Sequence, residues 1–489
     1  MKTPLIPKRT HYSRESSAEQ KQRGVTIVLV ALAMIAIVAM AALSIDVITL
    51  YLARAEAQKA ADASALAAAR ILSVSGITGD PLNLSGNWVH ICGPDNGIDG
   101  LATRVAKAVA NQNTIGGATA TATTVSYSIG SGSRSADCLS LSGTPFGVNP
   151  IVTVQVRRDS LPTFFSRLWG NTGNTISATA AAEAYNPSNS GVAGITAGTI
   201  VPVNPRCVKP WVVPNLDPYN SPNKFVDTDT GNIQHQGISL GGTGTGGVIG
   251  ETFWLVPDCE AAFGNCTLRG GVLPVQPIAN YDVPSLPAGT IDLLYVPGQT
   301  GPPGAIGVPA CAGADTFEVA IGGCDQPNHY ACGVPGAGAV DLSENPITPT
   351  TAGVQCLIHQ TDVSNITSSS GQDHLTPFRA PGEYPFQILA GNGGTAFAAS
   401  LPAETPVSTS ASIVSLPIYD NVGKTLVTGA LTPVTFVGFL QVFINAVDAN
   451  GNINVTVLNV SGCSNGVSSA VGNPVIANSP VPVRLITPP

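Results

Sequence analysis

The sequence contains few charged residues. Asp, Glu, Lys and Arg together make up 11% of its 489 residues, whereas roughly 25% is usual for soluble globular domains. The hydrophobic fraction is an ordinary 44%, so the chain is not one of the charge-rich, apolar-poor sequences that stay disordered. Its net charge of −8 opposes binding to nucleic acid, which requires a basic surface. We therefore predict a folded protein with no nucleic-acid partner.

The sequence also lacks the common motifs of catalytic and cofactor sites. It contains no Walker A motif, no His-Glu-x-x-His and no Cys-x2-Cys pair, and its six histidines are scattered. The segment Asp227-Thr-Asp229-Thr-Gly231 lacks the later acidic ligands of an EF-hand loop, so a solvated turn is predicted there. These absences predict no catalytic residue, no metal, no cofactor and no small-molecule substrate.

One segment does resemble an active-site motif. Gly237-Ile-Ser239-Leu-Gly241 fits the G-x-S-x-G pattern of a nucleophile elbow, in which a helix follows the serine and directs main-chain amides at the oxyanion. Here residues 242–247 are all Gly or Thr, a composition that opposes a helix. The same run contains G-x-G-x-x-G, but it lacks the strand and helix that a dinucleotide site requires. An exported hydrolase using Ser239 is therefore kept as a third alternative.

Basic residues concentrate at the N-terminus, directly before a long apolar segment. Residues 1–23 hold six basic and two acidic residues, a net charge of +4, whereas the rest of the chain has a net charge of −12. The 21 residues Val25–Ile45 carry no charge and would span about 31 Å as a helix, the thickness of a bilayer core. This segment is longer than the apolar part of a signal peptide. The positive-inside rule then predicts a single-pass protein of the inner (cytoplasmic) membrane.

The predicted topology places residues 1–23 in the cytoplasm and the bulk of the chain in the periplasm or another extracytoplasmic space, with the lipid bilayer as a partner. All ten cysteines lie on the exported side, where an even number predicts disulfides. The spacing leaves the connectivity open, although the short separations of Cys259/Cys266 and of Cys324/Cys332 allow local loops. The ten disulfide candidates are Cys92, Cys138, Cys207, Cys259, Cys266, Cys311, Cys324, Cys332, Cys356 and Cys463.

The apolar segment continues into an alanine-rich stretch. No Gly or Pro occurs from Val25 to Leu72, and alanine is the best helix former, so one continuous transmembrane and stem helix is predicted over 24–72. Residues 23–70 read RGVTIVLVALAMIAIVAMAALSIDVITLYLARAEAQKAADASALAAAR. This segment resembles the N-terminal part of TadE/TadG-like proteins of Flp (Tad) pilus assembly. The resemblance is strong over 23–72 and weak elsewhere.

The family pattern carries over residue by residue, with departures at Ala57, where Leu is usual, and at Ser64, where Ala is usual. A processed prepilin would have Glu at the fifth position after Gly24, and Leu29 stands there instead, so the resemblance implies a retained anchor. The matching positions are Arg23, Gly24, Asp46, Tyr51, Arg54, Gln58, Ala60, Ala61, Asp62, Ala65 and Leu66.

The resemblance implies a non-catalytic component of Tad/Flp-type pilus assembly, or of a related envelope structure, whose partners are other Tad or pilus assembly proteins. The polar residues of the stem are the candidates for packing against those partners. Their alternative role is pairing within the helix, because Arg54/Gln58 and Gln58/Asp62 are four residues apart. The candidates are Asp46, Tyr51, Arg54, Gln58 and Asp62. A membrane-anchored surface adhesin or binding module is the second hypothesis for the whole chain.

The predicted fold class is α+β. After the helix, residues 73–190 are predicted to form a pilin-like domain with an antiparallel sheet. A helix is predicted over 99–113, where Leu101, Val105, Ala108 and Val109 recur at helical spacing. The predicted strands cover 123–131, 151–157 and 175–184.

Residues 191–489 are predicted to form a disulfide-containing, mostly-β domain. Fifteen prolines occur between 201 and 310, and prolines break helices and central strands. No helix is predicted after about residue 195. The clearest element is a hairpin of residues 434–447 and 453–460 around Asn450-Gly451, because Asn-Gly is the strongest short turn signal.

Overall fold

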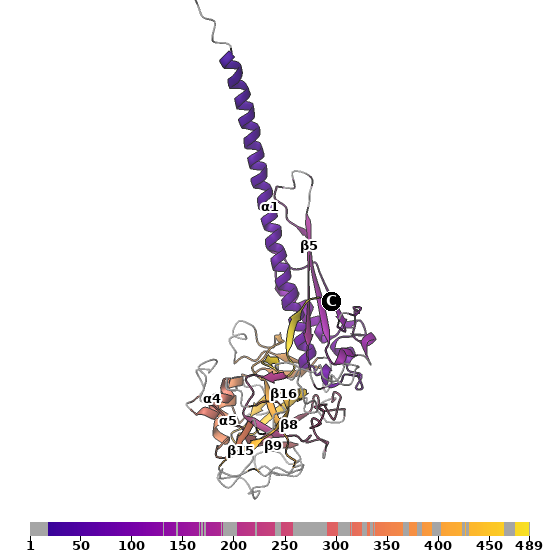
Figure 1. Cartoon of the computed structure of the whole chain (residues 1–489), viewed down its shortest axis with the longest axis vertical. Helices are drawn as coiled ribbons and strands as arrows, with labels where there is room; N and C mark the ends of the chain where they lie inside the picture. The colour runs from indigo at the N-terminus through magenta and orange to yellow at the C-terminus, as the bar shows by residue number, and fades with distance from the viewer. Residues whose placement is uncertain are drawn as a thin grey trace, which may run out of the picture.

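A single helix organises the protein. In the computed structural model, α1 (Ala18–Val74) is 57 residues long and confirms the continuous helix predicted over 24–72. Its first half extends beyond the rest of the molecule, and its second half runs beside β5 into the folded body (Figure 1). From Val25 to Leu72 the helix contains no Gly or Pro, so no main-chain hydrogen-bond donor is missing in this stretch.

The structure describes residues 18–488 except for a set of gaps. Beyond residues 1–17, which are outside it, the gaps are 131, 143–144, 166, 168–169, 171–172, 187, 189–202, 221–222, 240–245, 258–290, 302–312, 314, 325–329, 333–335, 337, 365–370, 379–383, 394–401, 423–425, 427–429, 464–474 and 489. Most of the tail predicted over 1–23 therefore lies outside the described residues.

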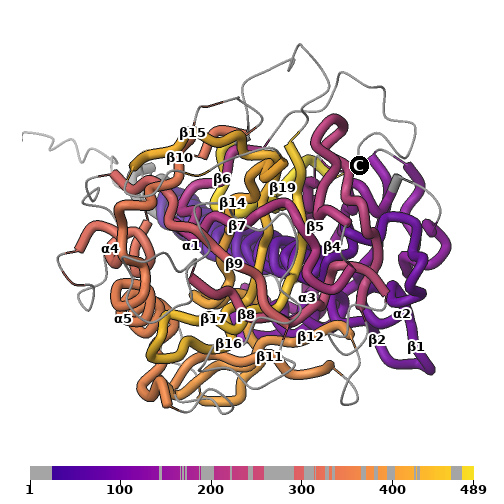
Figure 2. Tube along the Cα trace, turned by 90° about the horizontal axis from the view of Figure 1, so that it is seen from below, coloured from indigo at the N-terminus to yellow at the C-terminus, as the bar shows by residue number. Residues whose placement is uncertain are grey.

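A four-stranded antiparallel sheet lies against the second half of α1. The three predicted strands are present as β3 (Ala122–Ser128), β4 (Ile151–Leu161) and β5 (Asn174–Ala184). The fourth strand, β19 (Val483–Ile486), comes from the end of the chain and pairs with β5. Figure 2 shows β19 next to β5 and the C-terminus beside this sheet. The strand order β19-β5-β4-β3 thus joins a strand from the last residues of the sequence to the strands that follow α1.

Small side chains form the contact between α1 and this sheet. The buried face of the helix is almost entirely alanine, and every second residue of β5 from Ala178 to Ala184 is a buried alanine as well. Because alanine dominates the facing surfaces of the helix and of β5, the helix can approach this strand closely. The buried alanines of this part of α1 are Ala53, Ala57, Ala60, Ala61, Ala65, Ala68 and Ala69.

The predicted helix over 99–113 is present as α3 (Leu101–Gln112), which packs against α1. Its buried face differs in part from the predicted one. Ala102, Ala106 and Ala110 are fully buried, whereas Ala108 is exposed. The small residues of α3 are buried because they pack against the alanine face of α1. Hydrophobic spacing alone does not predict that the face with the smallest side chains is the buried one.

Six strands close into a barrel beyond the end of α1. The order around the barrel is β14-β16-β17-β8-β9-β7, with parallel pairs β7/β14 and β8/β9. The predicted hairpin is present as β16 and β17, and Gly451 in its turn has φ +73°. The strands are β7 (Trp211–Pro214), β8 (Thr252–Pro257), β9 (Asp292–Pro297), β14 (Ile413–Tyr419), β16 (Phe436–Val447) and β17 (Ile453–Gly462).

Two helices in the C-terminal part contradict the prediction that no helix follows residue 195. They are α4 (Thr316–Gly322) and α5 (Ile347–Ile358), which pack on each other. Pro349 lies in the first turn of α5, where a missing N–H costs little. A Cβ on Gly353 would come within 2.8 Å of Ile321, so this poor helix former is what allows the two helices to approach. Packing therefore outweighs the low local propensity.

Short elements cover the barrel and the sheet. They form the pairs β1/β2, β6/β18 and β10/β15 and the three-stranded sheet β11-β12-β13. Their bounds are α2 (Trp88–Ile91), β1 (Pro94–Asp95), β2 (Ile98–Asp99), β6 (Val203–Pro205), β10 (Gly338–Asp341), β11 (His374–Pro377), β12 (Phe386–Leu389), β13 (Pro406–Val407), β15 (Leu431–Val434) and β18 (Val475–Ala477).

The predicted disulfides are confirmed for the described cysteines, none of which is free. The bonds join Cys92 to Cys138, Cys207 to Cys324 and Cys332 to Cys463, over 46, 117 and 131 residues. Cys356 is also disulfide-bonded, and Cys259, Cys266 and Cys311 lie outside the described residues.

The local disulfide that the sequence allowed between Cys324 and Cys332 does not form, because each of the two cysteines bonds to a distant partner. Cys324 follows α4, and the Lys209 ammonium donates to the carbonyls of Ile321 and Gly323, both at 2.6 Å, which brings Cys207 to Cys324. Cys332 instead forms a β-bridge with Phe436 at the start of β16. Because spatial neighbours decide the pairing, sequence separation was a poor guide.

Candidate functional site

The first part of α1 presents apolar side chains that no described residue covers. Ile27 is 70% exposed and Ile35 65%, and almost no residue of this segment is buried. Soluble proteins rarely expose a contiguous apolar surface of this size. Among the described residues, α1 is the single helix that is long and apolar enough to cross a membrane. The protein therefore has an N-terminal helix compatible with a single-pass anchor.

Asp46 follows the apolar segment directly and is 4% exposed. Its carboxylate accepts hydrogen bonds from the main-chain N–H groups of Phe164, at 2.9 Å, and Phe165, at 3.1 Å. These two residues lie in the loop between β4 and β5. A buried carboxylate is costly unless it is hydrogen-bonded, so this loop and Asp46 hold each other in place. Asp46, a predicted candidate for packing against partners, therefore binds the β4–β5 loop of its own chain.

Tyr51 and Arg54 face outward from the stem. Tyr51 is 76% exposed, and Arg54 is exposed as well. One turn later, the Gln58 amide donates to Asp62 Oδ1 at 2.8 Å and to the Thr179 carbonyl at 3.4 Å. The predicted pairing of Gln58 with Asp62 inside the helix is therefore present. Of the five stem candidates, Tyr51 and Arg54 have the most open surroundings.

The stem matches a known protein family. Residues 24–70 match the family model of Flp pilus-assembly TadE/G-like proteins. The match confirms the resemblance found in the sequence and contains all five stem candidates. No curated protein and no solved structure matches the chain significantly.

The end of this TadE/G-like segment is joined to the barrel by buried polar groups. The Asn459 amide on β17 donates to the Ser73 carbonyl at 2.7 Å and to Thr78 Oγ1 at 2.9 Å. The Asn186 amide donates to Thr78 Oγ1 at 3.0 Å and to the Val460 carbonyl at 2.9 Å. All of these side chains are buried. A satisfied buried network of this kind fixes the orientation of the helix on the barrel.

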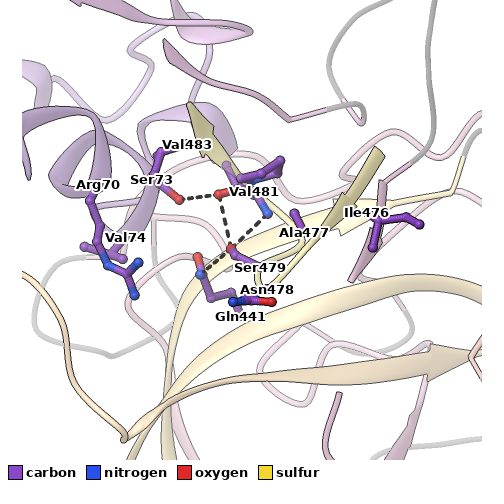
Figure 3. Close-up of a pocket in the computed structure, with 11 residues that line it drawn as sticks. Arg70, Ser73, Val74, Gln441, Ile476, Ala477, Asn478, Ser479, Val481 and Val483 are labelled. Carbon is purple, nitrogen blue, oxygen red and sulfur yellow. Dashed lines mark hydrogen bonds between the residues drawn. The ribbon is translucent and has the colours of Figure 1, made fainter. Parts of the chain in front are cut away.

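A cavity of about 410 Å³ lies beside this junction, between the last turns of α1, β16 and residues 476–483. Figure 3 shows Ser73 and Ser479 facing each other across the Val481 main chain. The Gln441 amide donates to Ser479 Oγ at 2.7 Å, and the Arg70 side chain donates to the Ser408 carbonyl at 2.9 Å. Burial lowers the pKa of Arg70. The Ser73 hydroxyl donates to the Val481 carbonyl at 2.8 Å and so attaches the C-terminal segment to the TadE/G-like helix.

The Ser239 motif does not form a nucleophile elbow in the part of the chain that the structure describes. Ser239 is fully buried, and its hydroxyl makes no hydrogen bond with any described residue, histidines included. A Cβ on Gly237 would lie 2.0 Å from the Gly246 carbonyl oxygen. The first glycine of the motif therefore allows the main chain at residue 237 to pass close to the main chain at residue 246. Residues 240–245 lie outside the described residues.

The segment 227–231 forms the predicted turn. Asp227 Oδ1 accepts hydrogen bonds from the N–H groups of Thr230, at 2.8 Å, and Asp229, at 3.0 Å. These bonds, led by the one from Thr230, lower the pKa of Asp227. The carboxylate is therefore used by the turn itself.

One cluster of metal-ligating side chains lies outside the TadE/G-like segment among the described residues. The ligand atoms of Asp217, His235 and Glu251 all lie within 4.8 Å of one another. Burial, followed by the charge of Asp217, raises the pKa of Glu251 to about 10. The sequence analysis predicted no metal ligand. The three residues come from separate loops without a spacing motif, so no sequence signal identified them.

Proposed function

We propose that the protein is a membrane-anchored, non-catalytic component of Tad/Flp-type pilus assembly, or of a related envelope structure, that acts by packing against other assembly proteins. The match of residues 24–70 to the TadE/G-like family carries this proposal. The surface of the stem agrees with it. The alanine face of α1 is covered by the chain's own sheet, whereas the face with Tyr51 and Arg54 stays open for a partner.

The proposed topology places residues 1–23 in the cytoplasm, the apolar part of α1 in the inner membrane and the remainder in the periplasm or another extracytoplasmic space. The basic N-terminal residues support this orientation. The disulfides also support it, since all of them lie after the apolar segment and disulfides persist in oxidising compartments. Alkaline phosphatase fused after Pro489 should be active, and the same enzyme fused before Met1 should be inactive.

We also infer that α1 and the sheet of β3, β4 and β5 form a pilin-like unit, because a long helix lies on an antiparallel sheet through small residues. The stem polar residues would then contact neighbouring assembly proteins at the outer face of this unit. Asp46 would contribute indirectly, by holding the β4–β5 loop against the stem.

Site-specific photo-crosslinking tests the proposed function. A photoreactive phenylalanine at position 51 should yield an adduct with another pilus-assembly protein in cells that carry the Tad system. The matched control is position 84, because Leu84 is 70% exposed but lies outside the stem. Adducts with assembly proteins at 51 and none at 84 support the proposal. If positions 51 and 54 both fail to crosslink to any assembly protein, the proposal is wrong.

A surface adhesin or binding module is the second candidate function. The observation that favours it is the Asp217, His235 and Glu251 cluster, since a metal site in the C-terminal part would suit a ligand-binding domain. Cells that lack the protein but retain normal pili, and that lose adhesion to surfaces, would favour this function over pilus assembly.

A further inference from the structure

Three metal-ligating side chains meet at one end of the barrel. Asp217 follows β7, Glu251 immediately precedes β8, and His235 lies between them in the sequence. Their ligand atoms are mutually within 4.8 Å. The side chain of Asp217 and the whole of Glu251 are fully buried, whereas the His235 side chain is 28% exposed. The cluster therefore lies just below the surface and is reached past the imidazole.

The two carboxylates have different surroundings. Asp217 Oδ1 accepts hydrogen bonds from the N–H groups of Tyr219, at 2.9 Å, and Asn220, at 3.1 Å. These bonds orient the carboxylate so that Oδ2 lies 3.4 Å from His235 Nδ1. Glu251 Oε2, in contrast, is buried and has no hydrogen-bond partner among the described residues. A buried carboxylate oxygen without a partner costs free energy, and a cation bound by the Glu251 carboxylate would offset that cost.

The Asn220 amide indicates where such a cation would be favoured. Its Nδ2 lies 3.0 Å from Asp217 Oδ2, 2.8 Å from His235 Nδ1 and 3.3 Å from Glu251 Oε1. An amide nitrogen has two hydrogens. The Asn220 amide can therefore donate a full hydrogen bond to only two of these three acceptor atoms. The atoms thus form an electronegative cage around a position that now holds the electropositive end of an amide. Turning the amide by 180° would bring Asn220 Oδ1 into the cage as a fourth ligand.

The basic group recorded beside this cage in the described part of the chain is the His235 imidazole, whose Nδ1 lies 3.4 Å from Asp217 Oδ2. Among the described residues, neither Asp217 nor Glu251 forms a salt bridge with Lys or Arg. Imidazole nitrogen and carboxylate oxygen are both ligands that Zn²⁺ accepts. Calcium prefers oxygen ligands alone, and a thiolate-based site is excluded because the nearest ligands are nitrogen and oxygen.

We propose that Asp217, His235 and Glu251 bind one divalent transition-metal cation of the zinc class, with Asn220 or water completing the coordination. The metal would join the loop after β7 to the start of β8 and so stabilise that end of the barrel. This site is separate from the TadE/G-like stem and does not depend on its role.

Zinc titration of the full-length protein tests the proposal. The protein is purified in detergent with its disulfides intact, stripped with EDTA, and titrated with zinc chloride by calorimetry, with thermal melting as a second measurement. We expect one equivalent of Zn²⁺ and a rise in the melting temperature. Glu251→Gln and His235→Gln preserve size and should each weaken zinc binding by about tenfold or more.

Asp227→Asn is the matched control, since Asp227 is a nearby carboxylate that its own turn already uses. Its zinc affinity should equal that of the unmodified protein. The metal-free melting temperature of every variant shows whether it is folded. The proposal is overturned if zinc does not bind at one equivalent, or if zinc affinity is the same in Glu251→Gln, His235→Gln and the unmodified protein.

Discussion

The carboxylate of Asp46 accepts a hydrogen bond from the main-chain N–H of Phe164 at 2.9 Å, across 118 positions of sequence. The first charged residue after the apolar segment therefore holds the loop between β4 and β5. The Phe164 side chain is 58% exposed beside the start of the stem. Aromatic residues are enriched at membrane–water interfaces, so in the proposed topology this contact would place the β4–β5 loop nearest the membrane.

We expect Asp46→Ala to release this loop. The substitution leaves the N–H groups of Phe164 and Phe165 without their acceptor, at a cost of about 1–3 kcal/mol if they stay buried. The loop should therefore open more often, and both amides should exchange hydrogen faster in detergent-solubilised protein. Asp62→Ala serves as the control, since Asp62 pairs within the helix. Equal exchange in all three proteins would show that Asp46 does not hold the loop.

The alanine contact between α1 and the sheet should not tolerate a larger side chain. Ala57 is fully buried against the sheet, whereas Ala55 is exposed on the same helix. Ala57→Leu should lower the free energy of unfolding by about 1–3 kcal/mol because it overpacks the contact, and Ala55→Leu should change it little. Denaturant unfolding with the disulfides intact measures both. A similar loss in the two variants would contradict a close contact at Ala57.

The junction of the stem with the barrel should depend on Asn459. Asn459→Ala removes two buried hydrogen bonds, those donated to the Ser73 carbonyl and to Thr78 Oγ1, so we expect a loss of about 1–3 kcal/mol of unfolding free energy. Asn450→Ala changes an exposed turn residue and is the control. Limited proteolysis after residue 74 gives a second measurement, since a loosened junction should be cleaved faster. An unchanged cleavage rate together with unchanged stability would disprove the role.

Lys209 should make stability depend on pH. Burial lowers the pKa of this lysine to about 7, from an ordinary value of 10.5. Above pH 7 the unfolded state then binds more protons than the folded state, so the contribution of Lys209 to stability rises with pH up to the unfolded pKa. The difference in unfolding free energy between the unmodified protein and Lys209→Met should increase by about 1 kcal/mol per pH unit from pH 7 to 9.

Lys209→Met is the appropriate comparison because methionine keeps an unbranched apolar side chain at this position and removes the titrating amine. It also removes the donor to the Ile321 and Gly323 carbonyls, which lowers stability at every pH. The slope with pH is therefore the decisive measurement. A difference that is constant from pH 7 to 9 would show that Lys209 keeps its charge when folded.

Local sequence signals predicted the elements that local physics governs. The absence of Gly and Pro predicted α1, alternation predicted β3 to β5, and Asn450-Gly451 predicted the β16–β17 hairpin. The two C-terminal helices escaped prediction because α5 contains Pro349 and Gly353, whose cost is offset by packing on α4. The stem residues were found through the family pattern, whereas Asp217, His235 and Glu251 were not found because separate loops bring them together.

The sequence by itself determined the apolar helix, its alanine-rich extension and the TadE/G-like pattern within it, because these depend on residues that are neighbours along one helix. Tertiary structure alone decided that β19 returns to pair with β5, that Cys207 bonds to Cys324, and that Asp46 holds Phe164. Each of these contacts joins residues far apart in the chain. Such contacts form when many weak packing interactions together offset the entropy of closing a long loop. A local sequence pattern cannot predict them, because those packing interactions involve residues from the whole chain.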